Sequence, residues 1–327
     1  MAKLIVSPSP HFQNKTTTQV LMNDVLIALA PATLVSLLFY GWNALLLLLV
    51  CVATCVGCEY LIEKYLRGRE IPCISATVVT GVLLALNLPP AAPWWVAFVG
   101  GLAAIGIAKM CFGGLGQNIF NPAIFGRVFL LVSFPVAMTN WVAPHSWLPI
   151  DAFSGATPLA QIQEGLHANP PIPVSQIIAE NGLSGWQAFF GLAGGSAGEA
   201  SALALIIGFV YLLVRRVIKP YIPVAILGTV AVLTTIFSLA DPTKFTGPVF
   251  NLLSGGLLLG AIFMATDYVT SPMTNIGMII YGVLIGLLTV LIRYFGSYPE
   301  GVSFAILIAN ATVPLLNKYC KPKRFAA

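Results

Sequence analysis

The sequence contains very few charged residues for its length. Lys, Arg, Asp and Glu make up 8% of its 327 residues, whereas 58% are hydrophobic; a typical soluble domain carries about 25% charged residues. A chain with so little charge cannot cover a globule with polar surface, so both a water-soluble protein and a disordered one are excluded. The net charge of +5 gives no indication of nucleic-acid binding, because Lys and Arg in a membrane protein mainly report orientation.

Histidine is scarce, and cysteine is confined to part of the chain. The three histidines, His11, His145 and His167, lie outside the apolar stretches, which excludes a haem held by paired intramembrane histidines. The six cysteines all lie outside Val136–Ser196, the longest segment between apolar stretches, so no external disulfide framework is predicted. Three of them share one helical face and are interpreted as packing residues, although the same spacing suggests iron–sulfur ligands in a soluble enzyme: Cys51, Cys55 and Cys58.

Long hydrophobic runs fill most of the chain. A helix needs about 20 apolar residues to cross a bilayer, and the runs predict an all-α integral membrane protein with about ten transmembrane helices. The third and fifth runs are short, which is typical of helices broken near a binding site. The runs are Asp24–Tyr40, Ala44–Tyr60, Ser75–Leu88, Trp94–Phe112, Pro122–Pro135, Ala197–Val214, Tyr221–Ala240, Asn251–Asp267, Gly277–Tyr294 and Gly301–Leu316.

Basic residues are distributed unevenly between these runs. If the N-terminus is cytoplasmic, only Lys244 and Arg293 fall on the outer side, and Val136–Ser196 contains neither Lys nor Arg. The positive-inside rule therefore predicts cytoplasmic termini and a periplasmic segment lying against the outer helix ends. The chain divides into a first membrane half (residues 1–135), this periplasmic loop insert (136–196) and a second half (197–327). Five spans in each half predict a 5+5 inverted repeat.

A glycine- and amide-rich segment precedes the fifth run, in the sequence GGLGQNIFNP. Asn121 suits a helix N-cap and Pro122 the first helical position. A helix start explains those two residues but leaves Gln117 and Asn118 unexplained. Amides beside a helix N-terminus are suited to holding a polar ligand ring or an anion.

Three acidic residues lie near the predicted cytoplasmic ends of spans: Asp24, Glu59 and Asp267. Their position favours simple solvation at the interface. The alternative is a cation-uptake site at Asp24 and Asp267, because carboxylate, hydroxyl and carbonyl oxygens suit a hard cation.

The external segment contains the sequence DAFSGATPL. Ser-Gly favours a turn, and Pro158 favours an extended conformation at Thr157. Gly155 and Ala156 are small enough for another molecule to approach the backbone closely.

Four segments together resemble the RnfD/NqrB family, the membrane subunits of Rnf complexes and of sodium-translocating NADH:quinone reductases. They are SGATPL, GGLGQNIFNPAIFGR, TGVLLALNLPPAAPWW and SYPEGVSFAILIANATVPL, and the short N-terminus favours the RnfD branch. The resemblance implies covalent FMN, attached to Thr157 through a phosphoester by a flavin transferase. The surrounding motif residues are Asp151, Ser154, Gly155 and Ala156. The resemblance also implies a second, non-covalent flavin, riboflavin, and Gln117, Asn118 and Asn121 are the candidates for binding it.

The function implied is an electron-relay subunit in the bacterial inner membrane. Together with the other Rnf subunits it would couple electron transfer between ferredoxin and NAD to Na⁺ or H⁺ translocation. The chain would then be part of an ion-translocating oxidoreductase without holding a complete active site. One alternative is a solute or ion channel or transporter of inverted-repeat type without a redox role. Another is a membrane scaffold with a vestigial flavin site.

Overall fold

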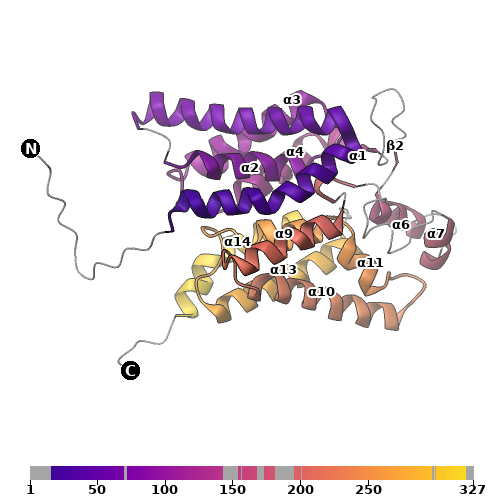
Figure 1. The fold of residues 1–327 in the computed structure, drawn as a ribbon. Helices are drawn as coiled ribbons and strands as arrows, with labels where there is room; N and C mark the ends of the chain where they lie inside the picture. Colours follow the sequence, from indigo (N-terminus) through magenta and orange to yellow (C-terminus); the bar gives the residue numbers. More distant parts are fainter. Residues whose placement is uncertain are drawn as a thin grey trace, which may run out of the picture.

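The computed structural model describes residues 16–69, 72–142, 154–155, 157–167, 173–180, 195–199, 201–296, 298 and 300–321, and these are largely helical (Figure 1). In Figure 1 the elements of the first half lie beside those of the second. The first half contains α1 (Thr18–Leu61), η1 (Ile62–Leu66), α2 (Ile74–Asn87), α3 (Trp94–Leu102), η2 (Ala103–Met110), α4 (Pro122–Ser133) and α5 (Pro135–Met138). Next come β1 (Trp141–Val142), β2 (Ser154–Gly155), α6 (Pro158–His167), α7 (Val174–Glu180) and η3 (Ala197–Glu199). The second half contains α9 (Ala202–Val214), α10 (Tyr221–Ala240), α11 (Pro248–Leu253), α12 (Leu257–Leu259), η4 (Gly260–Met264), α13 (Asn275–Phe295) and α14 (Val302–Tyr319).

The first two predicted spans are the two limbs of α1. This helix has 44 residues, or about 66 Å at 1.5 Å per residue, which is twice a hydrocarbon core of about 30 Å. Gly41 has non-helical dihedral angles (φ 56°, ψ −130°), and the chain reverses there into a second limb (Figure 1). The left-handed φ at Gly41 needs a residue without Cβ.

Two further runs are interrupted where hydropathy alone predicts continuous helices. The sixth is η3 followed by α9, and the eighth is α11, α12 and η4 with a break at Ser254–Gly256. Gly255 (φ 71°) and Gly256 (φ 66°) both adopt left-handed conformations at this break. The third and fifth runs are short helices as expected, because α2 has 14 residues and α4 has 12.

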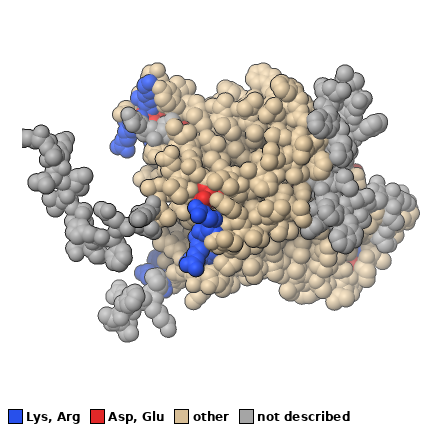
Figure 2. All heavy atoms as spheres, in the orientation of Figure 1, with Lys and Arg blue, Asp and Glu red and all other residues tan. Residues whose placement is uncertain are grey.

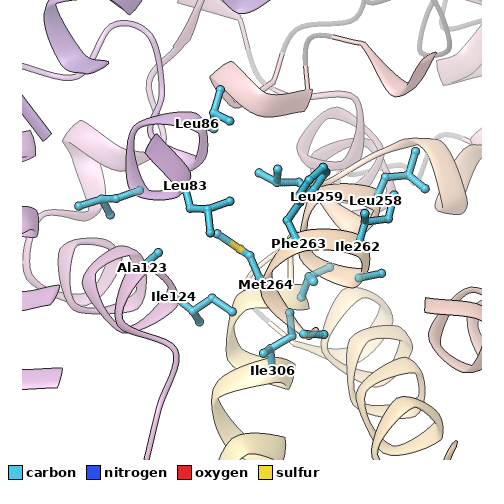
Figure 3. Close-up of a cluster of buried hydrophobic side chains, with 14 of the residues drawn as sticks. Leu83, Leu86, Ala123, Ile124, Leu258, Leu259, Ile262, Phe263, Met264 and Ile306 are labelled. Carbon is cyan, nitrogen blue, oxygen red and sulfur yellow. The ribbon is translucent and has the colours of Figure 1, made fainter. Parts of the chain in front are cut away.

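The core lies where the short helices of the two halves meet. Figure 3 shows side chains of α2, α4, α12, η4 and α14 converging on one apolar cluster, with Leu83 and Met264 directed toward each other. All of the labelled residues are buried, and Leu259, Ala123 and Ile124 are fully inaccessible. Helices that stop inside the protein are therefore held by contacts between the halves.

The outer surface is that of a multi-pass membrane protein. Four helices of the described residues are long and apolar enough to cross a bilayer, α1 with η1 counting as one, and four shorter apolar helices accompany them. The face drawn in Figure 2 is almost free of charge, and most of its basic side chains gather toward the end where α1 begins. The exposed basic residues include Lys64, Arg69, Arg215, Arg216, Lys219 and Lys318.

Helices α6 and α7 lie at the opposite end from the start of α1 and the end of α14 (Figure 1). Ile162 of α6 and Val174 of α7 form a small buried cluster against Phe250 of α11. Gln163 Nε2 donates to the Gly296 carbonyl at 2.8 Å. The described part of residues 136–196 thus packs on the helix ends, as expected from its composition.

Candidate functional site

A pocket of about 750 Å³, including the space at its open mouth, lies between the two halves at the level of the first turns of α1. Both halves contribute to its walls, which are mainly apolar with a few polar groups. Pockets with mainly apolar walls and a few convergent polar groups are typical of sites for organic ligands. Its polar lining residues are Thr80, Lys109, Asn118, Asn121, Thr266 and Asp267, and its apolar ones include Val25, Val79, Leu83, Leu212, Ile218 and Phe263.

Asn121 is fixed by two sets of hydrogen bonds. Its Oδ1 accepts from the backbone N–H groups of Ala123 (3.0 Å) and Ile124 (3.4 Å), so the predicted N-cap of α4 is confirmed. Its Nδ2 donates to the Met264 carbonyl at the end of η4, at 3.0 Å. Asn121 therefore holds the start of α4 against the second half while lining the pocket.

The other residues predicted at this site occupy different positions. Asn118 lines the pocket, and its Nδ2 donates to the Phe120 carbonyl at 3.1 Å. Gln117 is exposed and does not line the pocket; its side chain lies over Gly113, where Oε1 occupies the space of a Cβ. The structure thus brings Asn118 and Asn121 together and places Gln117 outside.

The two predicted cation-binding carboxylates do not share a ligand set. Asp24 is buried and forms an ion pair with Arg215 at 3.3 Å, while the Tyr211 hydroxyl donates to it at 3.1 Å. Asp267 lines the pocket, and its Oδ2 accepts from Thr270 Oγ1 at 3.1 Å. Burial raises the pKa of the Asp267 carboxyl, opposed by the hydrogen bond from Thr270.

Solvation at the interface is the wrong interpretation for Glu59. Its side chain is fully inaccessible and forms an ion pair with Lys109, at 2.6 Å between Nζ and Oε2. Thr77 Oγ1 donates to the same carboxylate oxygen at 2.5 Å. Hydropathy at a span end does not show whether a neighbouring helix covers the residue, and here η2 and α2 do.

Thr157 lies at the other end of the protein, immediately before α6. It is 3% exposed, and its Oγ1 accepts from the Ala160 backbone N–H at 3.2 Å, as an N-cap does. Ser154 and Gly155 form β2, which pairs with Trp141–Val142 in an antiparallel ladder. Asp151 and Ala156 lie outside the described residues. The motif therefore directs a hydroxyl toward a helix N-terminus, where a phosphate group is stabilised.

Sequence reasoning missed a cluster of charged side chains between these two regions. Arg127 of α4 forms an ion pair with Glu300, in the connection from α13 to α14. Its NH1 donates to Asn87 Oδ1 at the end of α2, at 2.6 Å. A charged residue well inside an apolar run is a functional candidate, and Arg127 carried that signal.

Arg293 forms the outer edge of the same region. Its guanidinium donates to the carbonyl groups of Asn251 (2.7 Å), Ser254 (2.8 Å) and Gly255 (3.2 Å). Arg293 thereby stabilises the helix end left open by the break after α11.

The cysteine face of α1 matches the packing interpretation. Cys51 and Cys55 are fully buried, and all six cysteines are free thiols. In the described part of the chain, no group of three or more His, Cys, Asp or Glu side chains is placed to hold a metal ion.

Comparisons with known proteins cover nearly the whole chain. The model of the NQR2, RnfD, RnfE family matches residues 5–326. The D subunit of the Na(+)-translocating ferredoxin:NAD(+) oxidoreductase complex of Acetobacterium woodii is 41% identical over 98% of this chain and 94% of its own length. The D subunits of the ion-translocating oxidoreductase complexes of Stutzerimonas stutzeri and Cronobacter sakazakii are 40% and 38% identical, over 93% and 97% of this chain and 91% and 97% of their own lengths.

Proposed function

The chain belongs to the NQR2, RnfD, RnfE family, and from that membership we propose that it is the electron-relay membrane subunit of an Rnf-type complex. In this proposal it carries FMN on Thr157 and riboflavin in the pocket lined by Asn118 and Asn121. Together with the other subunits it couples electron transfer between ferredoxin and NAD to translocation of Na⁺ or H⁺. The observation that carries the proposal is the pair of candidate flavin sites at opposite ends of one membrane-spanning chain. A channel without a redox role has no need of such a pair.

The pocket residues fit a flavin ring. Apolar walls suit the flat ring system, and the few convergent polar groups suit its heteroatom edge. Lys109 and Asp267 add one basic and one acidic group to the pocket wall. A bound flavin would supply the electron-transfer chemistry, while the protein residues fix its position, limit water and set its potential through burial and hydrogen bonds.

The Thr157 site fits a phosphate ester. The first turn of α6 presents backbone N–H groups next to Oγ1, and a helix N-terminus favours a negatively charged group. Because Thr157 is 3% exposed, we expect the flavin transferase to modify it before α6 docks onto the membrane helices. A covalent attachment suits a site facing away from the cytoplasmic cofactor pool, since it removes dissociation.

The orientation proposed is the one predicted by the positive-inside rule, in the bacterial inner membrane. Exposed basic residues lie near the start of α1 and the end of α14, and α6 and α7 lie at the opposite end. A cysteine introduced at Thr139 should react with an impermeant maleimide in intact cells. One introduced at Lys318 should react only after the cells are opened.

We further propose that the halves form a 5+5 inverted repeat. The observation that supports it is a matched pair of buried cations. Lys109 lies near the end of η2, in the fourth predicted span, and Arg293 lies near the end of α13, in the ninth. An in-plane two-fold axis would place them on opposite sides of the membrane.

Intact mass tests the relay proposal directly. The chain is expressed with a flavin transferase, and wild type is compared with Thr157→Ala by mass and by flavin fluorescence in a denaturing gel. Thr139→Ala is the matched control, because Thr139 is an exposed threonine in the same region. A mass increase of one FMN that is lost only in Thr157→Ala supports the proposal. An unmodified wild-type chain contradicts it and favours the transporter alternative.

A further inference from the structure

The ion pair between Arg127 and Glu300 joins the two halves of the chain at their broken helices. Arg127 lies on α4 of the first half, and Glu300 lies just before α14 of the second. The side chains are 5% and 14% exposed. A buried ion pair gains little net stability over apolar packing, so its position invites a functional explanation.

A second carboxylate borders the same small space as the Arg127 guanidinium. A Cβ built on Gly256 would lie 3.1 Å from Glu199 Oε1 and 3.8 Å from Arg127 NH1. Both groups therefore face the space left by this glycine. Glu199 Oε1 accepts from Ser196 Oγ at 2.7 Å. Arg127 thus pairs with Glu300, while the Glu199 carboxylate borders the same space at Gly256.

The charged cluster around the pair contains polar atoms without hydrogen-bond partners. Glu300 Oε1 is buried without a hydrogen-bond partner among the described residues, and so is Arg293 Nε, whose residue is 6% exposed. A buried carboxylate oxygen without a donor is costly while charged. Binding a proton at that oxygen leaves a neutral carboxyl, whose burial costs less than that of a charged one.

The groups around Glu300 oppose one another. Burial raises the pKa of its carboxyl from 4.5 to about 7. The charge of Arg127 lowers it, that of Glu199 raises it, and that of Arg293 lowers it. Neighbours on α4, η3 and α13 therefore place Glu300 where either protonation state can be populated.

We propose that Glu300 is a proton-binding site inside the membrane protein, and that Arg127 moves from Glu300 to Glu199 when Glu300 is protonated. The proton comes from water, an O–H bond forms at Oε1, and no electrons are transferred. Deprotonation breaks that bond, returns the proton to water and brings Arg127 back. The guanidinium keeps one carboxylate partner in both states, so the exchange leaves no unpaired cation.

The cluster lies between the two proposed flavin sites. Arg127 follows the pocket residue Asn121 by six positions on α4, or about 9 Å along the helix. On the other side, a Cβ on Gly255 would lie 2.4 Å from Leu159 of α6 and 2.8 Å from Arg293 NH2. If the proposed function holds, a proton taken up at Glu300 compensates the charge of an electron passing between those sites; this coupling role rests on that function.

Infrared difference spectroscopy on the purified full-length chain tests the protonation. Between about pH 5 and 9, wild type should show a protonated-carboxyl band that titrates near neutral pH. The band should be absent in Glu300→Gln and unchanged in the control Glu164→Gln, which alters an exposed carboxylate of α6. Identical spectra for wild type and Glu300→Gln overturn the proposal.

A second variant tests the movement of Arg127. Glu199→Gln removes both the alternative partner and a negative charge, so the titration midpoint of Glu300 should fall clearly below that of wild type. An unchanged midpoint overturns the exchange. If Glu300→Gln does not fold, Glu300→Asp keeps a carboxyl and should shift the band and its midpoint instead; an unshifted band counts against Glu300.

Intact mass of the same samples separates this proposal from the proposed function. A titrating Glu300 in a chain that never acquires FMN would leave the proton site standing and remove its role in the relay. A chain with FMN but no titrating Glu300 would leave the proposed function standing and overturn the proton site.

Discussion

Lys109 Nζ lies 2.6 Å from Glu59 Oε2, and their side chains are only 3% and 0% exposed. Glu59 comes from α1 and Lys109 from η2, 50 residues later. Lys109 also lines the pocket. Glu59 Oε1 has no hydrogen-bond partner among the described residues, so the carboxylate depends on Lys109 and Thr77 for its stability.

Replacing Lys109 by Met should destabilise the protein strongly. The variant leaves a buried carboxylate without its counter-ion, and breaking a buried pair in this way costs about 3–5 kcal/mol. The double variant Lys109→Met with Glu59→Gln should recover much of that loss, because neither charge remains. Thermal unfolding in detergent of all four combinations gives the interaction free energy as a double-mutant cycle.

The exposed pair Lys244–Asp241 is the control for that cycle. Its atoms are 3.5 Å apart and its side chains are 69% and 34% exposed, so Lys244→Ala should cost less than about 1 kcal/mol. Equal losses for Lys109→Met and Lys244→Ala would contradict the structural role assigned to the buried pair.

Asn121→Asp and Asn121→Ala should separate the two roles of this residue. An aspartate still caps α4 but cannot donate to the Met264 carbonyl, whereas alanine loses both interactions. A lost cap costs about 0.5–2 kcal/mol, and an unsatisfied buried carbonyl adds about 1–3 kcal/mol. Unfolding midpoints should therefore fall in the order wild type, Asp, Ala, with Asn118→Ala closer to wild type. If Asn121→Asp has the same unfolding midpoint as wild type, the hydrogen bond to Met264 contributes nothing to stability.

Local chemistry made several features predictable from sequence. Tyr221–Ala240 is both the seventh predicted run and helix α10, because a uniformly apolar stretch has no other stable form in a bilayer. The cap at Asn121–Pro122 was predictable because both residues act on their own helix turn. The short third and fifth runs followed from their length alone.

Long-range pairing and backbone breaks were not predictable in this way. Arg127 and Glu300 are 173 positions apart, and no local pattern connects them. The break at Gly255–Gly256 lies inside a continuous hydrophobic run, since hydropathy carries no information about φ. Gln117 and Asn118 are adjacent amides, yet only Asn118 lines the pocket, because the turn at Gly113–Gly116 directs their side chains differently.

Gly255→Ala should loosen the contact between α6 and the membrane helices. Gly255 has φ 71°, and its Cβ would lie 2.4 Å from Leu159 Cδ1. The left-handed conformation alone costs alanine about 1–2 kcal/mol. The unfolding midpoint should fall, and protease should cleave around α6 faster. Leu159→Ala in the same chain should restore part of the protection, since it relieves the clash but not the backbone strain.

Gly57→Ala is the matched control for that change. Gly57 lies in α1 with no atom within 4 Å of its Cβ position, so alanine should be neutral or slightly stabilising through helix propensity. Indistinguishable behaviour of the two alanine variants would show that the break at Gly255 is not required for docking of α6.

Asp267→Asn should change how stability depends on pH. Burial raises the folded-state pKa of Asp267 above 3.8, so the folded protein binds this proton more tightly than the unfolded chain. Its contribution to stability is therefore complete below pH 3.8 and is lost as the pH rises through the folded-state value. Wild type should lose stability relative to Asp267→Asn as the pH rises through the folded-state pKa of Asp267, measured as the difference in unfolding midpoints.

Asp241 gives the opposite sign and serves as the control. Hydrogen bonding from Thr243 lowers its pKa below 3.8, so its contribution is present above that value and is lost as the pH falls through the folded-state value. Asp241→Asn should therefore match wild type most closely in acid and become less stable than wild type as the pH rises.

If Asp267 binds a coupling cation, adding Na⁺ at neutral pH should raise the unfolding midpoint of wild type and leave that of Asp267→Asn unchanged. A midpoint difference independent of both pH and Na⁺ would show that Asp267 is neither desolvated in the folded state nor a cation ligand.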